Sequence, residues 1–182
     1  MVVSPAQLCH LPASLCDPAV GDAPVAYVRW RLVPAALLRG DAAAAAAAQA
    51  SGTGPFVILL ERLLTVGPLY RKKGYSKLVM THALADAAAH VGPQLNAERT
   101  LAKASMIVPA LPICIPAARA ALGIGMLNPA DAMAVDPTGQ WGSNPVYEFS
   151  MEPAVIGTLL QRWSVLPAEQ GGPIPAEGPS PA

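Results

Sequence analysis

A short basic segment, residues 66–80 (VGPLYRKKGYSKLVM), holds the most distinctive chemistry of the sequence. Gly74 is surrounded there by four cations, Arg71, Lys72, Lys73 and Lys77, in a chain of which only 13% is charged. A glycine lets the backbone approach an anion closely, and neighbouring cations offset the charge of that anion. The segment therefore predicts a site for a pyrophosphate group.

The elements on either side of this segment would position such a site. Residues 56–66 form an apolar run between glycine- and proline-rich breaks, which favours a strand, although its leucines leave a helix open. Gly67 and Pro68 then turn the chain. A helix is predicted from about residue 74 to residue 90 or 91, with one apolar face and Gly92-Pro93 as its stop. That face comprises Val79, Met80, Ala83, Leu84, Ala87 and Val91. The start of a helix offers free backbone N–H groups and a positive dipole end, which together bind phosphate.

This combination resembles the central motif of the GNAT acyltransferase superfamily. The motif is a strand, often with Val-x-Pro-x-Tyr/Phe, followed by Arg/Gln-x-x-Gly-x-Gly/Ala at the start of a helix. The matching residues here are Val66, Pro68, Tyr70, Arg71 and Gly74, with Ser76 at the last position in place of glycine or alanine. The resemblance implies an α/β fold with a mixed, mostly antiparallel central sheet flanked by helices.

The resemblance also implies a cosubstrate, acetyl-coenzyme A (acetyl-CoA), and the residues that hold it. The loop amides would bind the pyrophosphate, and the last residues of the strand would lie against the pantetheine arm. The residues implied are Leu64, Thr65, Val66, Arg71, Lys72, Lys73, Gly74, Tyr75, Ser76 and Lys77. The acceptor would be a primary amine on a small molecule or a protein.

Acyl transfer to an amine needs a base for the ammonium proton and an acid for the leaving thiolate. Glu61 is the candidate base, because desolvation within an apolar strand would raise its pKa towards neutrality. It could instead face solvent or pair with Arg62. Tyr147 is the candidate acid, although a half-buried strand tyrosine also suits simple packing. Cys114 has no His or Asp near it in the sequence, which favours a packing role.

The other segments suit a single acyltransferase-like domain over residues 25–166. Residues 1–24 are expected to be irregular, and the proline-rich tail at 167–182 is expected to be disordered. The alanine run at 42–48 follows a plausible N-cap, Asp41, and is either a short surface helix or a flexible insertion. The remaining predicted elements are strands at 25–33, 103–111 and 146–152, a helix at 116–124 and an amphipathic segment at 154–166.

The composition argues against several other classes of protein. Twelve basic and twelve acidic residues give a net charge of zero, which disfavours a nucleic-acid-binding or acidic-lipid surface. Three cysteines and three histidines show no metal-ligand spacing and no paired disulfide framework. The longest apolar stretch, 105–118, is short and interrupted by prolines, and no secretory signal is visible. We therefore expect a soluble, cytoplasmic protein without a metal.

Two alternatives to an enzyme remain open. The predicted helix at 116–124 lacks the asparagine and tyrosine that are familiar in the superfamily, so the chain could be a non-catalytic module that binds the coenzyme or a partner. The basic segment could also be a solvated turn that docks an acidic partner without any coenzyme. Binding of acetyl-CoA in preference to other polyphosphates would separate the second alternative from the first.

Overall fold

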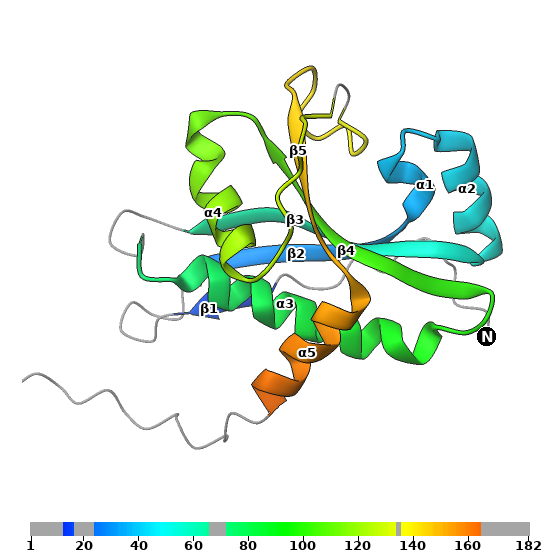
Figure 1. Cartoon of the computed structure of the whole chain (residues 1–182), viewed down its shortest axis with the longest axis horizontal. Coiled ribbons are helices and arrows are strands. Elements are labelled where there is room, and N and C mark those ends of the chain that lie inside the picture. Colours follow the sequence, from blue (N-terminus) through cyan, green and yellow to red (C-terminus); the bar gives the residue numbers. More distant parts are fainter. Residues whose placement is uncertain (1–12, 17–23, 66–71, 134–135, 165–182) are drawn as a thin grey trace, which may run out of the picture.

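The computed structural model describes residues 13–16, 24–65, 72–133 and 136–164 (Figure 1). Several sequence predictions lie outside these residues. They are Val66 and Arg71 of the predicted coenzyme site, the turn at 67–68, Tyr70 of the motif and the tail at 167–182.

A five-stranded sheet in the order β1-β2-β3-β4-β5 forms the centre of the fold. The strands are β1 (Ala13–Cys16), β2 (Pro24–Pro34), β3 (Gly54–Thr65), β4 (Arg99–Pro109) and β5 (Val146–Met151). Every neighbouring pair is antiparallel except β3 and β4, which are parallel. The predicted mixed, mostly antiparallel sheet is thus confirmed. One difference is β1, an edge strand within the segment expected to be irregular.

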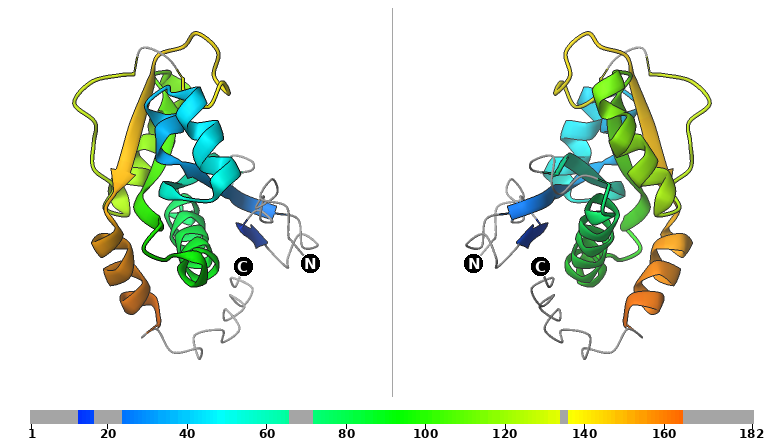
Figure 2. Two further views of the ribbon diagram at one scale, coloured as in Figure 1. Left: turned by 90° about the vertical axis from the view of Figure 1, so that its right-hand side faces the viewer. Right: turned by 90° about the vertical axis from the view of Figure 1, so that its left-hand side faces the viewer.

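Helices cover both faces of this sheet (Figures 1 and 2). They are α1 (Ala35–Leu38), α2 (Ala42–Ser51), α3 (Tyr75–Val91), α4 (Ile115–Gly123) and α5 (Pro153–Ser164), with 3-10 turns η3 (Gly92–Gln94) and η4 (Pro112–Cys114). Helix α3 connects β3 to β4, as a parallel pair requires a crossover. Helices α3, α4 and α5 pack on one face of the sheet, and α1 packs on the other. We call these the α3 face and the α1 face.

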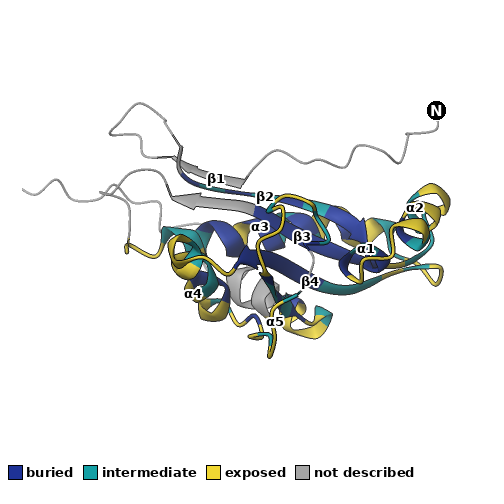
Figure 3. Ribbon diagram, turned by 90° about the horizontal axis from the view of Figure 1, so that it is seen from above, coloured by how far each residue is buried: buried dark blue, intermediate teal, exposed yellow. Residues whose placement is uncertain are grey.

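Residues 56–60 of strand β3 are buried on both faces, which explains their continuous apolar sequence. Phe56, Ile58 and Leu60 belong to the core on the α3 face, and Val57 and Leu59 to the core on the α1 face. Figure 3 shows the buried residues concentrated in these central strands. The leucines of this run are also compatible with a helix. The run is a strand because it pairs with β2 on one side and with β4 on the other.

The apolar face predicted for α3 is confirmed, because all six of its residues are buried. Thr81, a polar residue that is not part of the predicted face, is buried as well. Its Oγ1 donates a hydrogen bond to the carbonyl of Lys77 at 2.9 Å, so its hydroxyl is satisfied within the helix itself. A polar residue can therefore lie on the packed side of α3 without an unpaired donor.

The alanine run forms a helix, α2, rather than a flexible insertion. Asp41 is its N-cap, as predicted, and its Oδ1 accepts a hydrogen bond from the amide of Ala44 at 2.9 Å. Gly52 ends the helix in the left-handed conformation, with φ of 71°. Only Ala45 of this helix is buried, so α2 depends on alanine's helix propensity and on its caps.

The loop between α4 and β5 is anchored by a buried carboxylate, Asp136. Its Oδ1 accepts hydrogen bonds from the amide and the hydroxyl of Thr138 at 2.9 and 2.6 Å, and its Oδ2 from the amide of Trp141 at 2.7 Å. Burial alone would raise the pKa of Asp136, but these hydrogen bonds and one from the Gln140 backbone outweigh it and lower the pKa. The ionised carboxylate is therefore the form that organises the loop.

Replacement of Asp136 by Asn is expected to lower the free energy of unfolding at pH 7 by about 1–2 kcal/mol, because charge-assisted hydrogen bonds are lost. Because the pKa of Asp136 is lower in the folded state than its ordinary value of 3.8, its ionised carboxylate stabilises the fold at pH values above 3.8. This stabilisation is lost as the pH falls through the pKa of the folded state. Urea unfolding of both proteins at pH 7 and below pH 3 tests this. A difference between them that does not shrink in acid would contradict the assignment.

Candidate functional site

The sheet divides between its two parallel strands, and this division forms the centre of the candidate site. The parallel pairing runs from Gly54 opposite Arg99 to Leu60 opposite Met106. Beyond that rung β3 continues to Thr65, still paired with β2, and β4 continues to Pro109, still paired with β5. The backbone of residues 61–65 therefore has an edge that no β4 residue pairs with, and such an edge can hydrogen-bond an extended ligand that carries amides.

A β-bulge lies in β3 at the same level. Tyr27 of β2 pairs with Leu64 of β3, and Arg29 pairs with Glu61, so β3 contains one residue more than β2 over this stretch. Bulges locally increase the twist of a strand and are enriched next to active sites, where they redirect backbone and side-chain groups. The bulge in β3 thus lies in the stretch where β3 pairs with β2 and no longer with β4.

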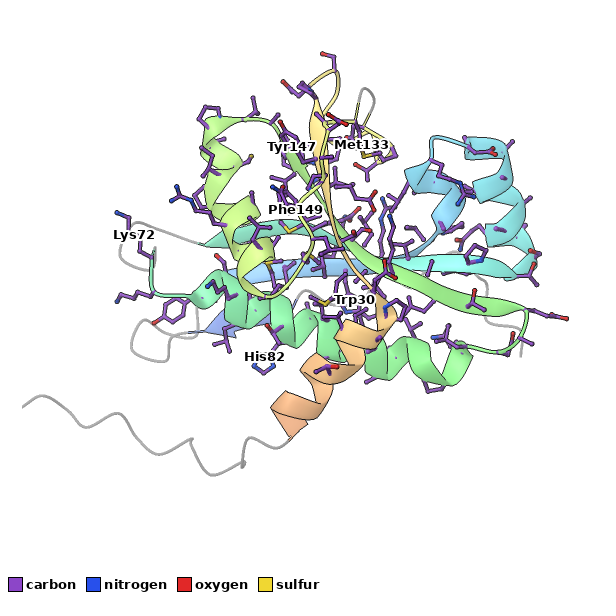
Figure 4. The ribbon with its side chains drawn as sticks, in the orientation of Figure 1. Trp30, Lys72, His82, Met133, Tyr147 and Phe149 are labelled. Atoms are coloured by element: carbon purple, nitrogen blue, oxygen red, sulfur yellow. The ribbon has the colours of Figure 1, made fainter. Side chains whose placement is uncertain are left out.

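The start of α3 is basic and carries no counter-charge of its own. Its first turn contains no acidic residue, its N-cap Gly74 offers no side-chain hydrogen bond, and Lys72, Lys73 and Lys77 are exposed. Gly74 has a φ of +81°, and a Cβ there would meet no atom within 4 Å. Figure 4 shows Lys72 projecting outward beside this turn. An anion can thus approach the helix end without obstruction.

Lys72 also has a left-handed backbone, with φ of 63°. A non-glycine residue in that region costs about 1 kcal/mol, and such residues are frequent at ligand-binding turns. The turn before α3 is therefore held in a shape that helix formation alone does not require.

A groove of about 890 Å³ opens beside the start of α3. Its walls are the first turns of α3, the end of α4 and the start of α5, and they include Gly74, Lys77, Leu78, Gly123, Ile124 and Val155. The Lys77 side chain crosses to α4, where its Cε and Nζ would lie 2.3 and 2.6 Å from a Cβ at Gly123. An apolar groove with a cation at its rim suits a ligand that has both an organic part and an anionic part.

Glu61, the predicted base, is the first residue of β3 beyond the last rung with β4. Its side chain is only 5% exposed and lies on the α1 face. Its Oε2 accepts a hydrogen bond from Arg29 Nη2 and its Oε1 one from Arg31 Nε, both at 2.7 Å. Glu61 therefore pairs with two arginines of β2 and does not face solvent. Each carboxylate oxygen keeps a further lone pair.

Tyr147, the predicted acid, lies on the other face of the sheet. It pairs with Val108 of β4 and packs, half-buried, against the core of the α3 face near α4. Figure 4 shows it on β5 above Phe149. Its hydroxyl makes no hydrogen bond to any other described residue. Glu61 and Tyr147 thus lie on opposite faces, both at the level where β3 and β4 separate.

The structure brings together most of the described residues that we predicted for the coenzyme. Lys72, Lys73, Gly74, Tyr75, Ser76 and Lys77 form the turn before α3 and its first turn, and Leu64 and Thr65 lie in the end of β3 that pairs with β2 but not with β4. Sequence reasoning missed Arg29 and Arg31. The alternation of residues 25–33 places both on one face of a strand, but nothing in the sequence pairs them with Glu61.

Other reactive groups lie away from this centre. Cys114, at the start of α4, is partly buried, and burial raises the pKa of its thiol, which favours the packing role. Within the described residues, no group of three His, Cys, Asp or Glu side chains could hold a metal ion. No helix in the described part of the chain is long and apolar enough to cross a membrane.

Comparison with known proteins supplies matches among solved structures. No family model matches the sequence, and no curated protein does. NAA60 of Arabidopsis thaliana in complex with acetyl-CoA has a TM-score of 0.49 and 15% identity, over 84% of this chain and 73% of that chain. The same protein with a bisubstrate analogue scores 0.49 at 14% identity, over 76% and 72% of the two chains. The NatC complex bound to Gag peptide and CoA scores 0.47 at 12% identity, over 75% and 67%.

At such scores and identities, what the matched proteins bind is a property of those proteins. The function proposed below is therefore based on the geometry of this chain.

Proposed function

We propose that this protein is an N-acyltransferase that moves an acetyl group from acetyl-CoA to a primary amine. The observation that carries the proposal is the division of the sheet between β3 and β4 next to the basic start of α3. The free edge of β3 offers backbone groups for an extended arm, and the start of α3 offers a site for phosphates. Acetyl-CoA is a ligand that has both parts.

The described residues fit this cosubstrate. The start of α3 would hold the pyrophosphate, because Gly74 leaves open space there and the first turn of α3 contains no acidic residue. The free edge of residues 61–65 would bind the amides of the pantetheine arm. The groove between α3, α4 and α5, with Lys77 at its rim, would take the nucleotide end.

The proposed reaction joins the amine nitrogen to the thioester carbonyl carbon and breaks the carbon–sulfur bond. The ammonium proton must leave before attack, and the thiolate must gain a proton afterwards. Glu61 is proposed as the base, through the lone pairs that its arginine contacts leave open, and Tyr147 as the acid. Their positions on opposite faces suit an acceptor and a cosubstrate that meet at the divided sheet from two sides.

A second candidate function is a non-catalytic module that binds the coenzyme or a partner. The contacts of Glu61 favour it, because both carboxylate oxygens already accept charge-assisted hydrogen bonds from arginines. In addition, Ile115–Gly123 contains neither asparagine nor tyrosine. Such a module would bind acetyl-CoA without turnover.

A thermal-shift titration with acetyl-CoA, beside ATP as a polyphosphate control, tests the binding part. A ligand that binds only the folded state raises the melting temperature in a saturable way, by an amount set by its concentration relative to Kd. We expect a shift with acetyl-CoA that ATP does not reproduce. Equal shifts, or none, would contradict the proposed site. Release of free thiol in the presence of amine acceptors then distinguishes the enzyme from the binding module.

The three cysteines without a paired framework support action in a reducing, cytoplasmic compartment. Recovery of the protein in a membrane or secreted fraction of its own cells would contradict this part of the proposal.

A further inference from the structure

The site on the α1 face carries more positive than negative charge. Two guanidinium groups, those of Arg29 and Arg31, share the single carboxylate of Glu61. Each arginine has five N–H donors, and only one from each binds Glu61. The Nε of Arg29 is buried and has no hydrogen-bond partner among the residues that the structure describes, which is an uncompensated cost in a folded protein.

The neighbouring charges on this face do not remove the excess. Glu148 of β5 accepts a hydrogen bond from Ser105 and pairs with Lys103, both at 2.6 Å. The register places these three residues on the α1 face, opposite Val57, Leu59 or Ile107. Lys103 and Glu148 neutralise each other, so among the described strand side chains on this face one positive charge is left at Arg29 and Arg31.

These arginines can also reach a ligand. The side chain of Arg29 is 37% exposed and that of Arg31 is 33% exposed, whereas Glu61 between them is 5% exposed. Glu61 and Arg29, which is opposite it, lie one residue beyond the last β3–β4 rung, and Arg31 lies next to them, opposite Leu59 in the part of β3 that still pairs with β4. Because α3 packs on the opposite face, the α1 face is the side from which an acceptor can approach the divided strands.

We infer that the acceptor amine carries a carboxylate, which Arg29 and Arg31 bind on the α1 face while its nitrogen reaches the acyl group. This inference rests on the proposed function. A guanidinium can bind a carboxylate with two parallel hydrogen bonds, and each of these arginines gives Glu61 only one, at 2.7 Å. One further carboxylate would neutralise the cluster, whereas a phosphate group would add about −1.5 to −2 charges.

Two kinds of acceptor that carry carboxylates are compared, a free acidic amino acid and an acidic peptide. Glutamate and the peptide Ala-Glu-Glu are each assayed against a neutral partner, glutamine amide and Ala-Gln-Gln amide, and against Ala-Lys-Lys amide, which carries no carboxylate. Transfer is followed by thiol release at saturating acetyl-CoA. Binding of the same acceptors to the protein saturated with CoA is measured by calorimetry. We expect about a 10- to 100-fold preference for one or both acidic acceptors, the range of a charge-assisted hydrogen-bond pair.

Arg31→Gln is the decisive variant, because Glu61 keeps Arg29 as a partner. It should reduce the preference for acidic acceptors at least about 10-fold and leave acetyl-CoA affinity unchanged. Arg119→Gln, at an exposed position of α4, removes the same charge elsewhere and should leave the preference intact. Arg31→Lys preserves the charge beside Glu61 and replaces Arg31→Gln if that variant does not fold. It should keep only part of the preference, because lysine lacks the planar fork.

The outcomes separate this inference from the proposed function. Transfer to neutral and acidic acceptors at equal rates would overturn the acidic substrate class and leave the acyltransferase standing. Charge-selective binding that depends on Arg31, without transfer to any acceptor, would support the carboxylate site and contradict the enzyme. Neither transfer nor charge-selective binding would overturn both.

Discussion

Replacement of Gly74 by Glu is expected to raise the Kd for acetyl-CoA at least about 100-fold, which corresponds to roughly 2.7 kcal/mol. Gly74 is the N-cap of α3, and a side chain there would enter the open space in which we place the pyrophosphate. The new carboxylate would repel that anion and compete for the amides of the helix end. Calorimetry with acetyl-CoA measures the loss, and circular dichroism verifies that the fold is kept.

A matched variant separates charge from backbone strain at this position. Gly74 has a left-handed φ of +81°, which costs most L-residues about 1 kcal/mol but suits asparagine better. Gly74→Asn should therefore bind acetyl-CoA within about 10-fold of the unmodified protein. Lys72→Ala should weaken binding only modestly, since backbone amides would carry most of the contact. Unchanged affinity in Gly74→Glu would exclude the proposed site.

Replacement of Glu61 by Gln is expected to reduce kcat/KM for acyl transfer by about 100- to 10,000-fold, the usual contribution of a general base. The amide is nearly isosteric with the carboxylate but cannot take a proton from an ammonium group. Acetyl-CoA affinity should not change, because Glu61 lies on the face opposite α3. Stability should fall by about 2 kcal/mol, as a buried carboxylate that joins two partly exposed arginines is lost.

Glu148→Gln is the matched control for this prediction. Glu148 lies on the same face and is also hydrogen-bonded and ion-paired, but its partners are Ser105 and Lys103. Its replacement should cost about 1 kcal/mol of stability without lowering the transfer rate measured on the folded fraction. If both variants lose stability and neither loses turnover, Glu61 has a structural role and the base must be sought elsewhere.

The sequence alone determined the main elements and the basic residues at the start of α3. The apolar periodicity of α3 predicted each of its six core residues, because a helix buries one face every 3.6 residues. Local rules also identified Asp41 as an N-cap and Gly74 at the helix start, since capping and φ preferences act within a few residues. The mixed sheet followed from the resemblance of a single motif.

The tertiary structure decided how distant residues meet. Arg29 and Arg31 reach Glu61 because β2 pairs with β3 in a register that places Arg29 opposite Glu61 and Arg31 opposite Leu59. The separation of β3 from β4 beyond Leu60 and Met106 has no local signal, since strand propensity does not specify where pairing stops. Tyr147 and Glu61 lie on opposite faces because the register in which each strand pairs with its neighbours fixes the face on which each of its side chains lies. Chain segments far apart in sequence thus form the candidate site through pairing that local propensity cannot determine.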